Sequence, residues 1–377
     1  MDKPIPFLDL KRLNAPHIQE ITEAVKRISM SGRYIGGPEI EAFENRLADY
    51  QQVRHIVGVS NGLDALRLIL RGYIEIGQLS VGDEVIVPAN TYIASVLAIS
   101  HAGLKPILVE PSTETLNLDT SLIDKHLTDR TRAIMTVHLY GRTCWDTTLM
   151  ETARQHNLLI IEDNAQGIGS LSTIPGLSGS YKTGSLGHAA AFSFYPTKNL
   201  GAQGDAGAVA TNDTALAQTV KALANYGSDY RYHNIYQGFN CRMDPIQAAV
   251  LNVKLQYLDN ENDRRRDIAT LYDRLISNPA IHLHTVTPAK STNYHQFIAV
   301  TPERNALQRH LAEQGIGTDI HYAVPPHRQP CYREQFDKLK LPVTEQLADS
   351  VLSLPIAPYL TDKEVARIAN AINRFPA

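Results

Sequence analysis

The sequence has little cysteine and no long apolar run. Cys144, Cys241 and Cys331 are far apart and form no CxxC pair, so we expect neither a disulfide framework nor a structural zinc site, and no metal. No segment reaches the roughly 20 consecutive apolar residues of a membrane span, and no apolar core of a secretory signal follows the first basic residue. We therefore expect a protein of the reducing cytoplasm that does not enter a membrane.

The sequence also lacks an excess of either charge. Its 36 Lys and Arg stand against 39 Asp and Glu, a net charge of −3, and neither sign is gathered in long runs. A nucleic-acid partner or an anionic membrane surface is therefore not expected. No GxGxxG motif opens a helix after an early strand, which disfavours a nicotinamide enzyme. Small molecules and other proteins remain as partners.

Short apolar runs alternate with stretches of helical periodicity along most of the chain. Two amphipathic helices are predicted first, over 18–28 and 39–50. Strands are then predicted at 55–60, 83–89, 105–110, 132–139, 157–163, 189–194 and 207–211, with helices from about 62, from about 92, near 122, near 149 and over 214–225. This alternation is typical of an α/β fold in which helices cover a mostly parallel sheet.

At 377 residues the chain is too long for one ordinary core. A long charged helical stretch runs from about residue 248 to residue 276, and a strand-like segment with two further helices follows it. The gap between 168 and 187 is rich in Gly, Ser and Pro and is predicted to be a loop. We expect a large domain over 1–250, which includes the N-terminal helices, and a smaller α+β domain over 251–377.

Asp163 ends the apolar run LLIIED, at the position where open parallel sheets place their ligands. A carboxylate there can keep a pyridine nitrogen protonated, which makes the ring an electron sink in pyridoxal phosphate (PLP) chemistry. Taken alone, such a residue more often caps the next turn. Lys198 follows an apolar strand and Ser193. A desolvated lysine amine can form a Schiff base, although a lone loop lysine is more often a solvated surface charge. The combination of these residues in one α/β domain favours PLP chemistry.

Two segments, IEDNAQGIGS at 161–170 and SFYPTKNLGAQGDAGAV at 193–209, resemble the signature of the DegT/DnrJ/EryC1/StrS sugar aminotransferases. The likeness extends over nearly the whole chain and includes FLDL, SGRYIGGPEIEAFE, SNGLDAL, VPANTYIAS, VHLYGR, YQGFNCRMDPIQAAVL and IHYAVPPHRQPCY. It implies a fold-type-I, aspartate aminotransferase-like PLP transferase, with a mostly parallel sheet in its large domain.

The resemblance also implies how this chain handles the pyridine ring. Lys198 would carry the cofactor as a Schiff base and act as general acid and base in both half-reactions. Asp163 would pair with the pyridinium nitrogen, and Gln166 would approach the ring hydroxyl. Tyr92 would stack on the ring face, the alternative being that it only packs the start of a helix.

The cofactor phosphate is expected at SNGLDAL, where Gly62 opens a helix after a strand and backbone amides can bind an anion. Ser193 would give its hydroxyl to the same phosphate. The family more often has small hydroxylated residues after this glycine, whereas this chain has Leu63 and Asp64, so backbone contacts are expected there instead of side-chain contacts. Asn240 matches a residue that reaches the phosphate of the neighbouring subunit, which implies a homodimer with shared active sites.

His321, Tyr322 and His327 match a substrate-side loop of the family. Buried or capping histidines are common, so a structural role is an open alternative for each of them, and equally for His138 and Tyr140.

The expected reaction is transfer of an amino group from L-glutamate to a nucleotide-linked keto sugar, in deoxyamino-sugar biosynthesis for a surface polysaccharide or glycoconjugate. SNGLDAL and NYGSDYRYHNIYQGFNCRMD are more similar to enzymes that aminate C3 of dTDP-3-keto-6-deoxyhexoses than to those that act at C4. The alternative is a 4-aminotransferase acting on a nucleotide 4-keto-6-deoxyhexose. Lys198 argues against the related dehydratases, which have histidine in its place, and the complete set of expected cofactor residues argues against a non-catalytic PLP-binding relative.

Overall fold

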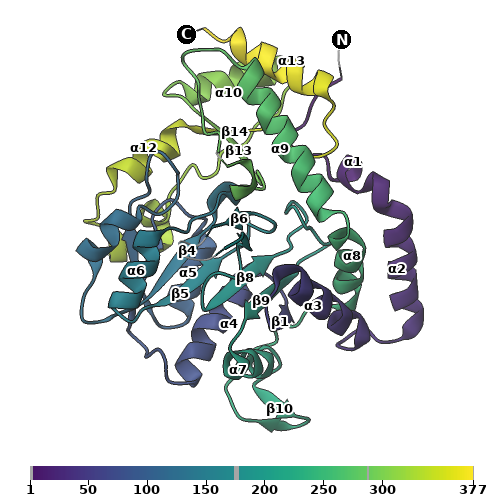
Figure 1. The fold of residues 1–377 in the computed structure, drawn as a ribbon, viewed down its shortest axis with the longest axis vertical. Coiled ribbons are helices and arrows are strands. Elements are labelled where there is room, and N and C mark those ends of the chain that lie inside the picture. The colour runs from purple at the N-terminus through teal and green to yellow at the C-terminus, as the bar shows by residue number, and fades with distance from the viewer. Residues whose placement is uncertain (1–2, 174–177, 287, 377) are drawn as a thin grey trace.

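The computed structural model describes residues 3–173, 178–286 and 288–376. A seven-stranded sheet lies at the centre of the molecule, with the order β1-β9-β8-β5-β4-β2-β3 (Figure 1). Its strands are β1 His55–Val59, β2 Glu84–Pro88, β3 Lys105–Val109, β4 Thr131–Val137, β5 Leu159–Asp163, β8 Ala189–Ser193 and β9 Gly207–Thr211. Only β9 pairs antiparallel with its two neighbours, β1 and β8. The predicted α/β fold with a mostly parallel sheet is confirmed.

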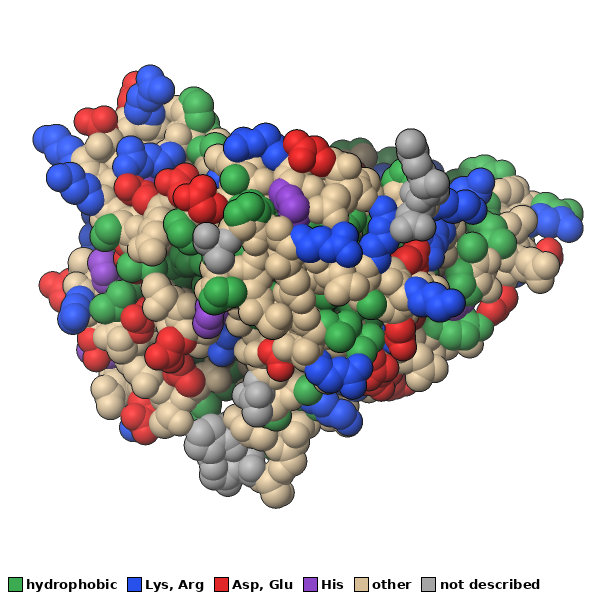
Figure 2. All heavy atoms as spheres, turned by 90° about the horizontal axis from the view of Figure 1, so that it is seen from above, with side chains coloured by type: hydrophobic (Ala, Val, Ile, Leu, Met, Phe, Trp, Pro, Cys, Tyr) green, Lys and Arg blue, Asp and Glu red, His purple; other side chains and the backbone are tan. Residues whose placement is uncertain are grey.

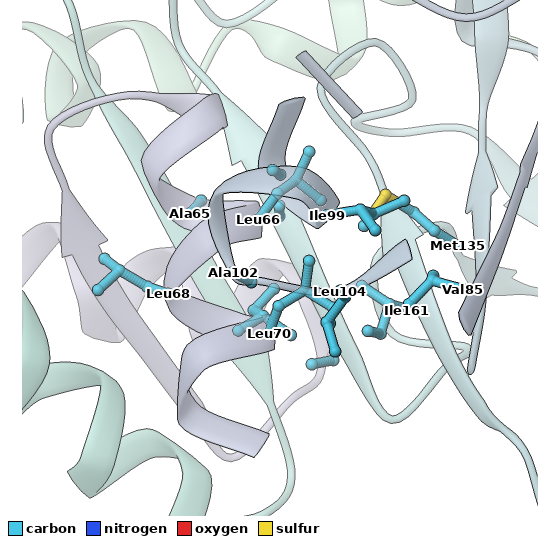
Figure 3. Packing of buried hydrophobic residues seen from close by; sticks show 14 of the residues in the cluster. Ala65, Leu66, Leu68, Leu70, Val85, Ile99, Ala102, Leu104, Met135 and Ile161 are labelled. Atoms are coloured by element: carbon cyan, nitrogen blue, oxygen red, sulfur yellow. The ribbon is translucent and has the colours of Figure 1, made fainter. Parts of the chain in front are cut away.

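Helices cover both faces of this sheet because its side chains alternate between two apolar layers. One layer joins Val85 and Met135 to α4 Gly62–Glu75, α5 Ile93–His101 and α7 Thr214–Ala224. Figure 3 shows Leu66, Ile99, Val85, Met135 and Ile161 meeting in it. The opposite layer contains α3 Pro38–Gln51, α6 Thr147–Gln155 and α8 Pro245–Leu255. A sheet buried on both faces leaves only its edges open for a site.

A second sheet, of three antiparallel strands, belongs to the C-terminal part of the chain. It has the order β12-β13-β14, with β12 His282–Leu283, β13 Phe297–Val300 and β14 Val351–Leu354. The helices of this part are α9 Leu258–Leu275, α10 Arg304–Glu313, α11 Arg333–Phe336, α12 Pro342–Ser350 and α13 Asp362–Asn373. Ile5 packs into the core of this second sheet, so the start of the chain lies against its end (Figure 1).

Several elements differ from their predictions. The helix predicted near residue 122 is a 3-10 helix, Thr120–His126, and the long stretch after residue 248 is broken at Gln256 and Tyr257 into α8 and α9. The predicted loop at 168–187 contains a short pair, β6 Leu171–Ser172 and β7 Tyr181–Lys182, and its residues 174–177 lie outside the described residues. A hairpin of β10 Ser228–Tyr230 and β11 His233–Asn234 was not predicted.

The N-terminal helices match the sequence more closely. After α1 Leu10–Asn14, α2 spans Ile18–Ser31 and contacts α8. Its buried residues, Ile21, Ala24 and Ile28, recur at the spacing of one helix face. Within the described residues, no helix is long and apolar enough to cross a membrane. Lys and Arg side chains are interspersed with Asp and Glu over the face seen in Figure 2.

Candidate active site

The carboxyl ends of the parallel strands bring the predicted site residues to one edge of the central sheet. Asn61 and Gly62 follow β1, Tyr92 follows β2, and Tyr140 follows β4. Asp163 ends β5 and precedes the segment 164–166, and Ser193 ends β8 and precedes the segment 194–198. Because these strands run in the same direction, residues distant in sequence meet at this edge.

Asp163 is buried, with 5% of its surface exposed. The Ser95 hydroxyl donates to its Oδ2 atom at 2.7 Å, and the backbone N–H of Ala165 donates to Oδ1 at 3.1 Å. Burial raises the pKa of the Asp163 carboxyl, while these two donors and the Lys198 amine oppose the rise. A buried carboxylate is stabilised by a cationic partner. A protonated ring nitrogen fits this requirement.

Lys198 lies on the loop after β8 and is partly buried. Burial lowers the pKa of its amine to about 8, and the negative charge of Asp163 opposes the shift. Within the described part of the chain, the amine makes no hydrogen bond or ion pair. A lysine with a depressed pKa and an uncommitted amine can react with an aldehyde near neutral pH.

Gln166 is held in one orientation by its neighbours. Its Oε1 atom accepts from the backbone N–H of Tyr140 at 2.6 Å, which orients the Nε2 atom as the donor of this side chain. Nε2 donates to the Tyr322 hydroxyl at 2.9 Å. The ring of Tyr322 lies 5.1 Å from that of Tyr92, which is 54% exposed. The Tyr140 hydroxyl donates to the backbone oxygen of His321. Four predicted residues are thus brought together with Tyr140.

The start of α4 has the features that a phosphate needs. The Asn61 side chain accepts from the N–H of Asp64 at 2.8 Å, while the N–H groups of Gly62 and Leu63 have no acceptor within the described residues. A Cβ atom at position 62 would lie 2.7 Å from the Cβ of Ser193, so glycine allows this close approach. The Asp64 carboxylate points to Arg67, at 2.7 Å. Free amides beside a serine hydroxyl fit an anion.

Three of the predicted or considered residues have other contacts. His138 is fully buried and bridges two groups, because its Nδ1 atom accepts from the N–H of Cys144 and its Nε2 atom donates to Glu162. This arrangement is structural. His327 is buried and lies 3.0 Å from a Glu345 oxygen, on helix α12. Asn240 is exposed and pairs with Asn225 in an isolated bridge.

Other residues of the site were not predicted from the sequence. Ser95, which binds Asp163, is itself 2.8 Å from the Thr91 hydroxyl. His295 is buried, and its burial and the nearby Lys198 charge hold its pKa well below its usual range, so the ring is neutral. Its Nδ1 atom lies 3.1 Å from the Asn199 side-chain oxygen. The sequence offered one signal for these residues: Ser95 lies one helical turn after Tyr92, a predicted site residue.

A cavity of about 280 Å³ lies next to the Lys198 loop. Its lining includes Phe7, Tyr195, Arg265, His295, Gln296 and His321. Two larger cavities, of about 540 and 930 Å³, are lined by none of the predicted site residues. The smaller cavity reaches the predicted residue His321 and combines aromatic walls with polar groups, as ligand pockets do.

Pyridoxal phosphate requires an acid for its ring nitrogen, an amine for its aldehyde and donors for its phosphate, and all three are present at the sheet edge on which fold-type-I PLP aminotransferases bind it. The fold and the site therefore define an aminotransferase of that class. More specifically, the chain belongs to the DegT/DnrJ/EryC1/StrS aminotransferase family, which its residues 16–373 match. The predicted family, enzyme class and PLP cofactor are confirmed.

Relatives match over almost their full lengths. The chain is 48% identical over 371 residues to a dTDP-3-amino-3,6-dideoxy-alpha-D-galactopyranose transaminase of Aneurinibacillus thermoaerophilus, covering 98% of this chain and 99% of the relative. It is 43% identical over 373 residues to a dTDP-3-amino-3,4,6-trideoxy-alpha-D-glucose transaminase of Streptomyces venezuelae, covering 98% and 96%. The solved structure of S. venezuelae DesV in complex with a ketimine intermediate superposes with a TM-score of 0.92 at 42% identity, covering 99% of this chain and 98% of DesV.

Proposed function

We propose that this enzyme transfers an amino group from L-glutamate to C3 of a dTDP-3-keto-6-deoxyhexose, for deoxyamino-sugar biosynthesis. The observation that carries the proposal is the 48% identity, over nearly all of both chains, to a transaminase whose name specifies a 3-amino-3,6-dideoxy sugar. A second relative, at 43% identity, is also named for a 3-amino sugar. Lys198, the residue that separates aminotransferases from the related dehydratases, is present.

The side chains at the sheet edge have complementary roles in the proposal. Bound PLP supplies an aldehyde carbon and an electron-withdrawing ring. Asp163 keeps the ring nitrogen protonated, and Ser95 holds Asp163 in place. Lys198, with a pKa of about 8, can both accept and donate a proton near neutral pH. Tyr92 would cover one ring face, and Gln166 would donate toward the ring oxygen through the same Nε2 atom that contacts Tyr322.

The phosphate and the substrate complete the proposed site. The amides of Gly62 and Leu63 and the hydroxyl of Ser193 would bind the phosphate, whereas the Asp64 amide already donates to the Asn61 side chain. His321 and Tyr322 would face the substrate, because both lie beside Gln166, Tyr140 or the Lys198 charge. His327 supports this loop from its contact with Glu345.

A homodimer with shared active sites is part of the proposal. Asn240 is exposed, and near it the β10–β11 hairpin projects beyond α7 (Figure 1). Exposed apolar side chains gather along this segment: Tyr226, Tyr230, Tyr232 and Ile235. Such a group on a protruding hairpin is typical of a subunit interface.

The unpaired cysteines, one of them exposed, support a cytoplasmic location.

An acceptor comparison tests the reaction. The purified holoenzyme is incubated with L-glutamate and with equal concentrations of a dTDP-linked 3-keto or 4-keto 6-deoxyhexose, and the amino sugar is measured by mass spectrometry. We expect the 3-keto sugar to react at least about 10-fold faster, because the position of the carbonyl decides whether it meets the reacting amine. The Lys198→Ala variant is the control and should give no product. Preference for the 4-keto sugar would overturn the proposed regiochemistry.

A further inference from the structure

Asp64 places a carboxylate in the first turn of α4, beside the amides expected to bind the cofactor phosphate. An acidic side chain is favourable at a helix N-terminus when no other anion is bound. Here it would compete with the phosphate for the same N–H groups and would repel it. The chain therefore needs a means of removing this negative charge from the phosphate position.

Three side chains hold the Asp64 carboxylate away from the amides. Oδ1 lies 2.7 Å from the Arg67 Nη2 atom, in an ion pair one turn along the helix. Oδ2 accepts from the Ser60 hydroxyl and, at 3.0 Å, from the Asn61 amide. The side chains of Asp64 and Arg67 are only 16% and 22% exposed, so solvent screens this pair less than a surface pair.

Arg67 is itself fixed by the segment that carries Asn240. Its guanidinium lies 4.3 Å from the ring centre of Phe239, and its Nη2 atom donates to the Cys241 sulfur at 3.2 Å. The backbone N–H of Ser60 donates to the oxygen of Cys241 at 3.1 Å. Arg67 thus joins the turn at the start of α4 to the residues on both sides of Asn240.

We propose that Arg67 is a positioning residue for cofactor binding, which neutralises Asp64 and keeps the amides of Gly62 and Leu63 open to the phosphate dianion. This inference rests on the proposed placement of the phosphate at the start of α4. It predicts that loss of the Arg67 charge weakens binding only of a cofactor that carries the phosphate. It also predicts that removal of the Asp64 charge restores this binding.

The test compares the binding of PLP with that of pyridoxal, which lacks the phosphate. Both are titrated into the apoenzyme, and binding is followed by absorbance. In Arg67→Met, the PLP dissociation constant should rise about 10-fold or more, while that of pyridoxal stays unchanged. The double variant Asp64→Asn/Arg67→Met should recover most of the PLP affinity. Arg71→Met, one turn further along α4 and paired with Glu75 at 3.0 Å, is the matched control and should bind PLP like the wild type.

An equal loss of affinity for PLP and pyridoxal in Arg67→Met would show general loosening of the site and overturn the inference, as would an unchanged PLP affinity. If Arg67→Met does not fold, Asp64→Asn alone still decides, because it should bind PLP at least as tightly as the wild type, and weaker binding contradicts the inference. Gly62→Ala tests the underlying placement separately: unchanged PLP binding in this variant would overturn the phosphate position, whichever sugar the enzyme aminates.

Discussion

Asp163 and Lys198 share one electrostatic environment. Burial disfavours the charged form of each, raising the pKa of the Asp163 carboxyl and lowering that of the Lys198 amine to about 8. Each charge partly stabilises the other. Burial is the larger effect on the Lys198 pKa, and the acid that serves the ring nitrogen raises the pH at which the lysine becomes reactive.

This coupling predicts the pH dependence of cofactor attachment. The neutral amine is the nucleophile, so the rate at which apoenzyme binds PLP covalently should rise with pH and reach half its maximum near pH 8. In Asp163→Asn the stabilising negative charge is lost, the Lys198 pKa falls further, and the midpoint should move to lower pH. Stopped-flow absorbance measures both rates.

Borohydride reduction followed by peptide mass spectrometry is the companion control, and it should place the label on Lys198. A midpoint near pH 10.4, the ordinary pKa of an exposed lysine, would contradict the depressed pKa. An unlabelled Lys198 would contradict the assignment of the attachment site.

Among the secondary-structure elements, strand β5 supports the site with both of its faces. Asp163 faces the cofactor side, and its neighbour Glu162 points the other way because side chains alternate along a strand. Glu162 is fully buried and accepts from the backbone N–H groups of Gly184, Leu186 and Gly187 and from His138. It orders the loop that leads into β8, the strand before Lys198.

Glu162→Ala should therefore destabilise the protein strongly, since a buried histidine, the buried N–H of Gly184 and two partly buried N–H groups lose their acceptor. We expect a loss of about 3–5 kcal/mol in the free energy of unfolding, measured by urea denaturation of the apoenzyme. Glu75→Ala removes a glutamate from the less buried pair with Arg71 and should change the free energy of unfolding by less than about 1 kcal/mol. Equal effects of the two substitutions would refute the supporting role of Glu162.

For the complete protein, the proposed sharing of active sites makes one subunit dependent on the other. Lys198→Ala and Asn240→Ala homodimers should each have impaired sites. In a mixed dimer, the Asn240→Ala subunit keeps its lysine and receives Asn240 from its partner, which restores one site of two. When the two variants are co-expressed with different tags and the mixed dimers are isolated, they should therefore have about half of the wild-type activity at limiting PLP. The activity is assayed after tandem purification.

If Asn240 acted within its own subunit, the mixture would have less activity than the Asn240→Ala homodimer, and the proposed exchange would be wrong. The oligomeric state is measured in parallel by light scattering.

The division into domains at residues 250 and 251 stays a prediction. Ile5 packs in the core of the C-terminal part, so a domain boundary after residue 250 assigns Ile5 and the core around it to different domains.

The order of strands and helices, the family, and the positions of Asp163, Gln166, Ser193 and Lys198 could all be predicted from the amino-acid sequence. Apolar periodicity and contiguous motifs are local properties, which a single chain displays before it folds. Local patterns also led to an error near residue 122, where a short segment has too few turns to define an α-helix, and to another at Gln256, where the helical pattern of the sequence continues across the break between α8 and α9. The β10–β11 hairpin has no buried alternation to reveal it.

The side chains that control those residues are known only from the folded arrangement. Ser95 lies 68 positions from Asp163, and Arg67 lies 174 positions from Cys241, yet each pair forms a hydrogen bond. The parallel strands bring such residues to one edge, and burial there shifts the pKa values of Asp163 and Lys198. Desolvation and charge pairing depend on distances in space, and these distances exist only after the sheet has formed.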